Sequence, residues 1–171
     1  MQLTMARTVS AAAVLCLVGC SLGSASSDGT LRMGGDPGEV CLTHEPSGEY
    51  TYGLETLRNE AAESVALTGV TLENARGVAI AEAFVAPIED QTLVGVLKGW
   101  PPTNVHPRAW ADRRAVAGTS LTAADGDWNL VLHLVATTPD AEFTAARVSY
   151  VQGRRSYFAA GTTGVIMRAS C

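Results

Sequence analysis

The chain has 171 residues, of which 47% are hydrophobic, and its 12 basic and 17 acidic side chains give a formal net charge of −5. This length fits one domain with a proper buried core. The acidic balance argues against a nucleic-acid-binding protein and against a polybasic lipid sensor, because both rely on clustered Lys and Arg.

The N-terminal segment has the features of an export signal. Arg7 is its only charged residue, and the apolar run over residues 11–18 is too short to span a bilayer. The run ends in Leu17-Val18-Gly19-Cys20, and small polar residues follow it. This stretch resembles the lipobox of bacterial lipoproteins, in which the cysteine is acylated and becomes the mature N-terminus.

The resemblance implies a signal peptide over residues 1–19 and acyl chains, such as palmitate, on Cys20. Two or more acyl chains anchor a protein firmly to a bilayer. No later segment has 18 consecutive apolar residues, so we expect the lipid to be the only membrane attachment. The expected location is the extracytoplasmic face of the cell membrane. Residues 20–38, rich in Ser, Gly and Asp, are predicted to form a flexible tether, and the folded domain is predicted at residues 39–171.

Two of the four cysteines are expected to form a disulfide. Cys16 would leave with the signal peptide and Cys20 would carry lipid, which leaves Cys41 and Cys171 in an oxidising compartment. A redox or metal-binding thiol pair is the alternative, but these two residues lack the CxxC spacing of such pairs. We therefore predict a structural Cys41–Cys171 disulfide, which stabilises the domain by roughly 4–5 kcal/mol at most.

Apolar and polar residues alternate from residue 50 onward, which predicts strands rather than helices. In the segment 65–72 the alternation changes phase at Gly69, as expected at a β-bulge. The clearest strand places Trp128, Leu130, Leu132 and Leu134 on one face. Further strands are predicted at residues 50–54, 78–85, 93–97, 148–150, 156–159 and 165–167. The predicted fold is all-β, an antiparallel β-sandwich of immunoglobulin-like type with seven or eight strands.

The domain is similar to the small β-sandwich lipoproteins of unknown function found in actinobacterial envelopes. The shared features are the strand Tyr50-Thr51-Tyr52-Gly53-Leu54, a polar turn at Asn59, a Trp-Pro loop and a terminal cysteine. Lys98 is the only lysine, whereas Arg and Ala are frequent, a bias typical of GC-rich genomes. This similarity implies no catalytic residue.

The loop over residues 99–114 is the main candidate for a functional site. It is longer than most strand connections, and it combines two tryptophans, three prolines and three arginines. Trp and Arg are enriched in interface hot spots, and proline restricts the backbone. The predicted partner-binding residues are Trp100, Pro101, Pro102, Arg108 and Trp110. The alternative is that the two tryptophans fold back and cover an open end of the sandwich.

Other charged and metal-binding residue types give weaker signals. The histidines His44, His106 and His133 are not spaced as a metal motif, although a site assembled from distant strands stays open as an alternative. His133 lies on the face of its strand opposite the leucines, where packing is the ordinary role. The pair Arg154-Arg155 lies at a predicted hairpin and is interpreted as protection of an edge strand.

The sequence has no GxSxG, SxxK or HExxH motif, so no catalytic residue and no cofactor are predicted. We predict a non-enzymatic protein-binding or assembly module of the cell envelope. It would attach to the membrane through Cys20 and bind an envelope protein through the loop, without binding nucleic acid. A metal- or small-ligand-binding envelope protein is the alternative, and a hydrolase with a site built from distant loops is the third.

Overall fold

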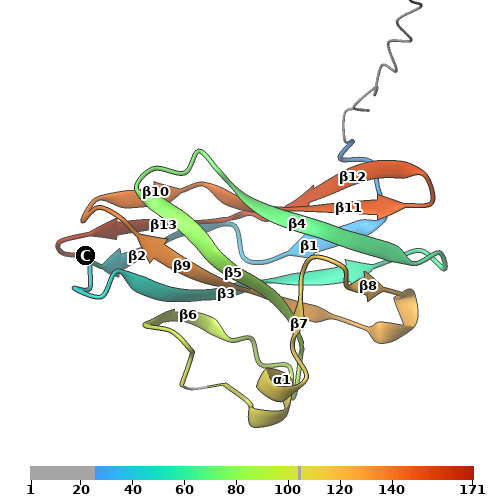
Figure 1. The fold of residues 1–171 in the computed structure, drawn as a ribbon, viewed down its shortest axis with the longest axis horizontal. Coiled ribbons are helices and arrows are strands. Elements are labelled where there is room, and N and C mark those ends of the chain that lie inside the picture. The colour runs from blue at the N-terminus through green and yellow to red at the C-terminus, as the bar shows by residue number, and fades with distance from the viewer. Residues whose placement is uncertain (1–25, 104) are drawn as a thin grey trace, which may run out of the picture.

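The computed structural model describes residues 26–103 and 105–171 (Figure 1). Its strands are β1 (Leu31–Gly34), β2 (Gly38–Thr43), β3 (Glu49–Asn59), β4 (Val65–Glu73), β5 (Val78–Pro87), β6 (Gly95–Lys98), β7 (Arg114–Ala115), β8 (Ser120–Leu121), β9 (Trp128–Ala136), β10 (Ala141–Phe143), β11 (Ala145–Gln152), β12 (Arg155–Ala160) and β13 (Thr163–Arg168). Its helices are the short α1 (Pro107–Ala111) and a 3-10 turn, η1 (Ala123–Asp125). Within these residues no helix is both long and apolar enough to cross a membrane.

The strands form a sandwich of two layers. One layer is a six-stranded sheet of order β1-β3-β9-β5-β7, in which β6 also pairs with β3. The other layer contains the sheets β12-β11-β4-β8 and β10-β13-β2. In Figure 1, β12, β11 and β4 lie above β3 and β6 of the six-stranded sheet. The strand pairs are antiparallel except for β2 and β13, which run parallel. The predicted all-β sandwich is therefore confirmed.

The described residues contain thirteen strands, more than the seven or eight predicted. Five of the strands, β1, β6, β7, β8 and β10, have only two to four residues. Segments this short leave little periodicity in a sequence. They form where the edge of a longer strand offers free backbone hydrogen-bonding groups.

The interior between the two layers is apolar, with aromatic residues at its centre. Leu130, Leu132 and Leu134 of β9 belong to this core, as predicted, and each is at most 1% exposed. Tyr52 from one layer meets Phe143 from the other edge to face, with the ring centroids 5.5 Å apart. This geometry is the favoured one for aromatic pairs.

The predicted bulge in β4 is also confirmed. Ser149 of β11 faces Gly69, but the next residue, Tyr150, faces Leu67, so Thr68 is the additional residue. Because of the bulge, Val70 and Leu72 pack against the same core as the buried Leu67, despite the phase change that the sequence shows at Gly69.

The predicted tether is wrong for residues 26–38, because these residues belong to the fold. Strand β1 pairs with the end of β3, and Leu31 is only 3% exposed. The backbone N–H of Leu31 donates to the Tyr150 hydroxyl at 3.2 Å. Gly29 approaches the same hydroxyl so closely that an added Cβ would lie 1.8 Å from it. Composition alone does not predict β1, because the strand is held by backbone pairing with β3 and contributes only one buried leucine, Leu31.

The predicted disulfide is confirmed. Cys41 in β2 bonds to Cys171, and their Cα atoms are 5.8 Å apart. The bond joins the parallel pair of β2 and β13 covalently, since Cys171 follows β13 closely. The predicted signal peptide at residues 1–19 and the predicted acylation site, Cys20, lie outside the described residues.

Candidate functional site

The described residues of the loop, 99–103 and 105–113, lie as a third layer on the outer face of the six-stranded sheet, on the far side from β11 and β12 (Figure 1). Its start is held by Thr51 of β3, whose hydroxyl donates to the Gly99 carbonyl at 2.9 Å. Further along, Pro107 begins helix α1, where proline's fixed φ suits the first turn. The one buried residue of the helix is Ala109.

Aromatic rings attach the loop to the sheet. The Trp100 ring is parallel to the imidazole of His133, with centroids 4.6 Å apart, and stacks on Phe84 at 6.0 Å. Trp110 meets the edge of Trp100 at 5.4 Å. The Arg113 guanidinium lies 4.2 Å above the Trp110 ring centroid and donates to the Trp110 carbonyl at 2.6 Å. These contacts hold the two parts of the loop together.

The predicted partner-binding residues therefore divide into two groups. Trp100 and Trp110 are half-buried and Pro102 is buried. The tryptophans fold back, as in the alternative interpretation, but they cover the outer face of the six-stranded sheet rather than an open end of the sandwich. Pro101 and Arg108 are exposed on the outside of the layer. The two tryptophans contact each other, and the sequence does not show that their other aromatic neighbours come from β5 and β9.

His133 is a largely enclosed polar residue under this layer, next to the fully buried Thr51. Its side chain is 11% exposed, and Nε2 is 3.4 Å from Glu49 Oε1 while Nδ1 is 3.8 Å from Glu82 Oε2. Neither nitrogen forms a hydrogen bond with the described residues. The imidazole thus lies between two carboxylates, with the Trp100 ring across its face.

The predicted packing role of His133 agrees with this position. His44 and His106 do not join it: the described residues contain no group of three or more His, Cys, Asp or Glu side chains placed to hold a metal ion.

A second candidate region lies at a bulge in β3, which the sequence did not predict. Tyr52 pairs with Leu132 and Glu55 with Leu130, so β3 has one residue more than β9 between these pairs. The bulge turns Leu54 outward and places Glu55 inside the core, fully buried. Asn129 fixes it, because its Nδ2 donates to the Gly53 carbonyl at 3.2 Å and to the Glu55 carbonyl at 3.0 Å.

The Glu55 carboxylate is enclosed by backbone. Its Oε1 accepts from the N–H groups of Thr163 at 3.0 Å and Thr162 at 3.2 Å, and from the Tyr52 hydroxyl at 3.1 Å. Burial raises the pKa of Tyr52, and the charge of Glu55 adds to this effect. The other oxygen, Oε2, has no partner among the described residues, and an added Cβ on Gly35 would lie 2.6 Å from it.

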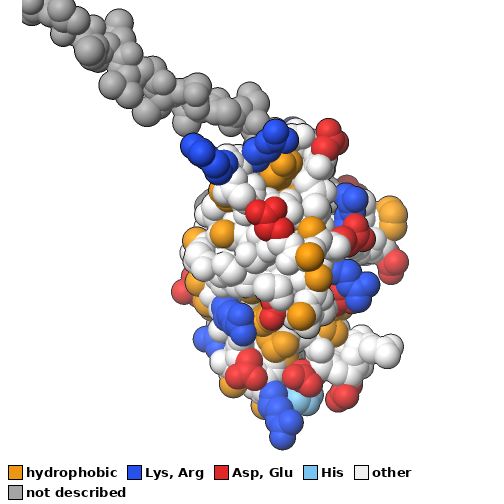
Figure 2. Space-filling view, turned by 90° about the vertical axis from the view of Figure 1, so that its right-hand side faces the viewer, with side chains coloured by type: hydrophobic (Ala, Val, Ile, Leu, Met, Phe, Trp, Pro, Cys, Tyr) orange, Lys and Arg blue, Asp and Glu red, His pale blue; other side chains and the backbone are white. Residues whose placement is uncertain are grey.

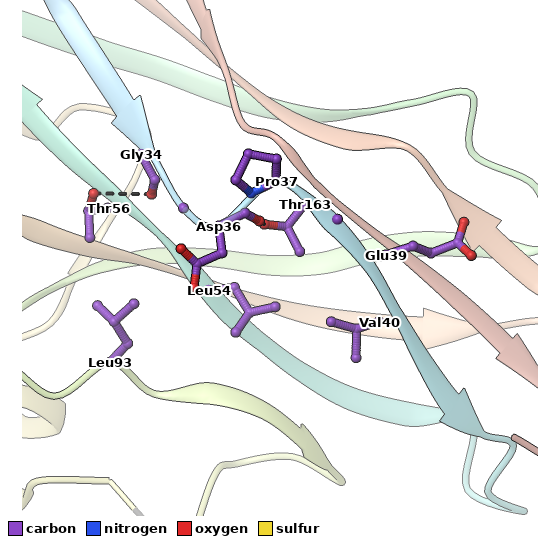
Figure 3. Close-up of a pocket in the computed structure, with 11 residues that line it drawn as sticks. Gly34, Asp36, Pro37, Glu39, Val40, Leu54, Thr56, Leu93 and Thr163 are labelled. Carbon is purple, nitrogen blue, oxygen red and sulfur yellow. Dashed lines mark hydrogen bonds between the residues drawn. The ribbon is translucent and has the colours of Figure 1, made fainter.

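A cavity of about 630 Å³ lies on the other side of Gly35, between the β1–β2 connection and the bulge. Leu54, Leu93 and Val40 supply apolar surface, and Figure 3 shows the Asp36 carboxylate on the same side as Leu54 and Leu93. In the same view the Glu39 carboxylate points away from these residues. The lining residues include two acidic side chains and no basic one. This combination suits a ligand with an apolar part and an amine.

The cavity wall is made by the residues that the sequence analysis assigned to the tether. The segment Gly34-Gly35-Asp36-Pro37-Gly38 is held by side-chain hydroxyls: Thr56 Oγ1 donates to the Gly34 carbonyl at 3.1 Å and Thr163 Oγ1 to the Asp36 carbonyl at 2.8 Å. The clustered glycines and the Asp-Pro pair are a turn signal that could have identified this connection.

Comparison with known proteins gives no family. No protein-family description and no curated protein matches the sequence. Among solved structures, the VesB protease of Vibrio cholerae is similar over 81% of this chain and 32% of the protease, with 12% identity and a TM-score of 0.36. The CooA pilin subunit of enterotoxigenic Escherichia coli is similar over 81% of this chain and 98% of the pilin, with 11% identity and a TM-score of 0.35.

The secreted serine protease VesC of Vibrio cholerae is similar over 77% of this chain and 23% of the protease, with 11% identity and a TM-score of 0.26. This chain thus spans about a third of VesB and a quarter of VesC. TM-scores this low identify neither a shared family nor a shared activity.

Proposed function

We propose that this protein is a lipid-anchored binding module of the bacterial cell envelope. Acyl chains on Cys20 hold it on the extracytoplasmic face of the membrane, and the layer over residues 99–113 contacts a partner protein. The observation that supports this proposal best is the construction of that layer, in which a stacked aromatic base fixes an exposed outer surface.

A fixed loop is suited to recognition because binding costs less when the contacting groups are already ordered. The base of the layer is Trp100 on His133 and Phe84, and the Arg113 guanidinium holds Trp110. Pro101 and Arg108 remain exposed above this base. Arginine can pair with a carboxylate through two parallel hydrogen bonds, so an acidic protein surface is the partner that fits.

The proposal is tested by crosslinking the full-length acylated protein in its native cells, followed by affinity capture and mass spectrometry. We expect Arg108→Ala to reduce capture of one envelope protein at least tenfold, without a change in Tm. Arg76→Ala, which removes an exposed arginine far from the loop, should capture as much as the wild type. Equal capture by all variants would exclude the loop as the binding surface.

The cavity supports a second candidate function, the binding of a small amphipathic amine. The specific observation is that Asp36 forms no ion pair with the described residues and lies beside the apolar side chains Leu54 and Leu93. Hexylamine and hexanol are matched probes, measured by calorimetry on the full chain. We expect hexylamine to bind and Asp36→Asn to abolish its advantage over hexanol; equal binding of both probes would exclude a role for the charge.

A further inference from the structure

The described chain begins beside strand β12. Ser26 forms a parallel bridge with Tyr157: its N–H donates to the Ser156 carbonyl at 3.3 Å, and its carbonyl accepts from the Phe158 N–H at 2.9 Å. These bonds fix the place from which the chain leads back toward Cys20. They also occupy part of the free edge of β12, which is an outer strand of its sheet.

The distance from this point to the lipid is limited by covalent geometry. Six residue steps separate Cys20 from Ser26. Because each step spans at most about 3.6 Å, Ser26 lies within about 22 Å of an acylated Cys20, whatever path the chain takes. An anchored protein must therefore keep the β12 edge close to the bilayer surface.

The arginines of the β11–β12 hairpin can contact anionic groups, and the exposed acidic residues Asp28 and Glu63 lie at the same end of the molecule. The β11–β12 hairpin carries Arg154 and Arg155, both exposed and without an ion pair among the described residues. The nearby Arg32 and Arg58 are instead neutralised by Glu60 and Asp127. Figure 2 looks onto this end and shows Lys and Arg side chains at its upper edge, next to the start of the described chain.

Two aromatic side chains follow the arginine pair on β12. Tyr157 stacks on Tyr150, and Phe158 lies under the Arg147 guanidinium; both Tyr157 and Phe158 are half-buried. Of these two residue types, tyrosine is enriched at membrane–water interfaces.

We propose that the β11–β12 hairpin lies against the membrane, with Arg154 and Arg155 on the phosphates of anionic lipid headgroups. This inference rests on the proposed lipid anchor and adds the orientation of the domain. It gives the arginine pair a role beyond the edge protection expected from the sequence, because Ser26 already covers part of that edge. In this orientation α1, on the opposite side of the sandwich in Figure 1, faces away from the bilayer.

Hydrogen exchange on the reconstituted protein tests the proposal. The full-length acylated protein is placed in vesicles of phosphatidylcholine alone, or of phosphatidylcholine and phosphatidylglycerol in equal amounts. We expect amides of residues 152–158 to exchange more slowly in the mixed vesicles, by up to roughly 25-fold, since each arginine near an anionic surface favours contact about fivefold. The variant R154A/R155A should lose this difference, whereas the matched control R76A/K98A should keep it.

Vesicle flotation separates the two proposals. If the wild type floats, Cys20→Ser does not, and the hairpin exchanges equally in both vesicle types, the anchor stands and the hairpin contact is wrong. A difference in exchange that R154A/R155A retains would also exclude the arginine contact. If the wild type fails to float and carries no acyl mass on Cys20, the anchor and the orientation that rests on it are both wrong.

Discussion

The two faces of the six-stranded sheet are covered in different ways. The inner face presents Leu130, Leu132 and Leu134 to the apolar core. The outer face presents His133 and Val131, and the loop layer covers it so that β9 is buried over residues 128–134. Periodicity in a strand therefore reports the face that meets the other sheet. Coverage of the second face depends on a loop, which the strand's own sequence does not encode.

Truncation of a side chain on the inner face should cause the largest loss of stability. We expect Leu132→Ala to lower the free energy of unfolding by about 3 kcal/mol, because a fully buried leucine leaves a cavity that the close-packed core fills poorly. Denaturant titration of the disulfide-intact protein measures this change. A loss below about 1 kcal/mol would mean that the core is much looser than the burial of β9 indicates.

Glu55 is a fully buried carboxylate on the inner face, and its removal should cost nearly as much. In Glu55→Ala, the N–H groups of Thr162 and Thr163 and the Tyr52 hydroxyl lose their shared acceptor, for which we expect a loss of about 2–3 kcal/mol. Glu55→Gln keeps an acceptor oxygen at the same place and should cost distinctly less. Equal losses for both variants would show that the negative charge, rather than the acceptor, stabilises the bulge.

On the outer face, Trp100→Ala should cost about 1–2 kcal/mol, because the ring is only half-buried although it stacks on His133 and Phe84. We further expect amides of residues 99–113 to exchange faster while those of β9 stay protected. Trp100→Phe, which keeps a ring in the stack, is the matched control. If β9 loses its protection as well, the two faces unfold as one unit and the comparison fails.

A partly exposed ion cluster should give the smallest effect. Arg168 and Arg76 lower the pKa of Glu142 by hydrogen bonding to its carboxylate, so the ionised form favours the folded state. This stabilisation is fully present above the ordinary pKa of a glutamate and is lost as the pH falls through the lowered value. Glu142→Gln should therefore lower the Tm slightly at pH 7 and leave it unchanged in strong acid. Glu89→Gln, at a carboxylate outside any ion pair of the described residues, should show no such pH dependence.

The features that sequence reasoning predicted depend on local pattern or on counting. Alternation identified the leucine face of β9, the phase change at Gly69 identified the β4 bulge, and the remaining cysteines identified the disulfide. Each of these signals is complete within one segment or follows from composition.

The features that it missed depend on contacts between distant segments. In β3 the buried residues Tyr52 and Leu57 are five positions apart, an odd spacing that indicates a bulge between them. Leu54 stands two positions after Tyr52 and so continues the regular alternation in the sequence, which hides the bulge. Strand β1 exists because the edge of β3 accepts it. Whether Trp100 is buried depends on a ring from β5 and an imidazole from β9, which the sequence of the loop does not contain.

Strand β1 also determines how the protein can be prepared for further work. A recombinant form beginning at residue 39, where composition places the start of the domain, would lack β1 and leave the backbone of residues 56–59 unpaired on that side. A bare strand edge of this kind promotes pairing between molecules. Such a protein is expected to aggregate on concentration, whereas one that begins at or before Ser26 keeps the edge closed.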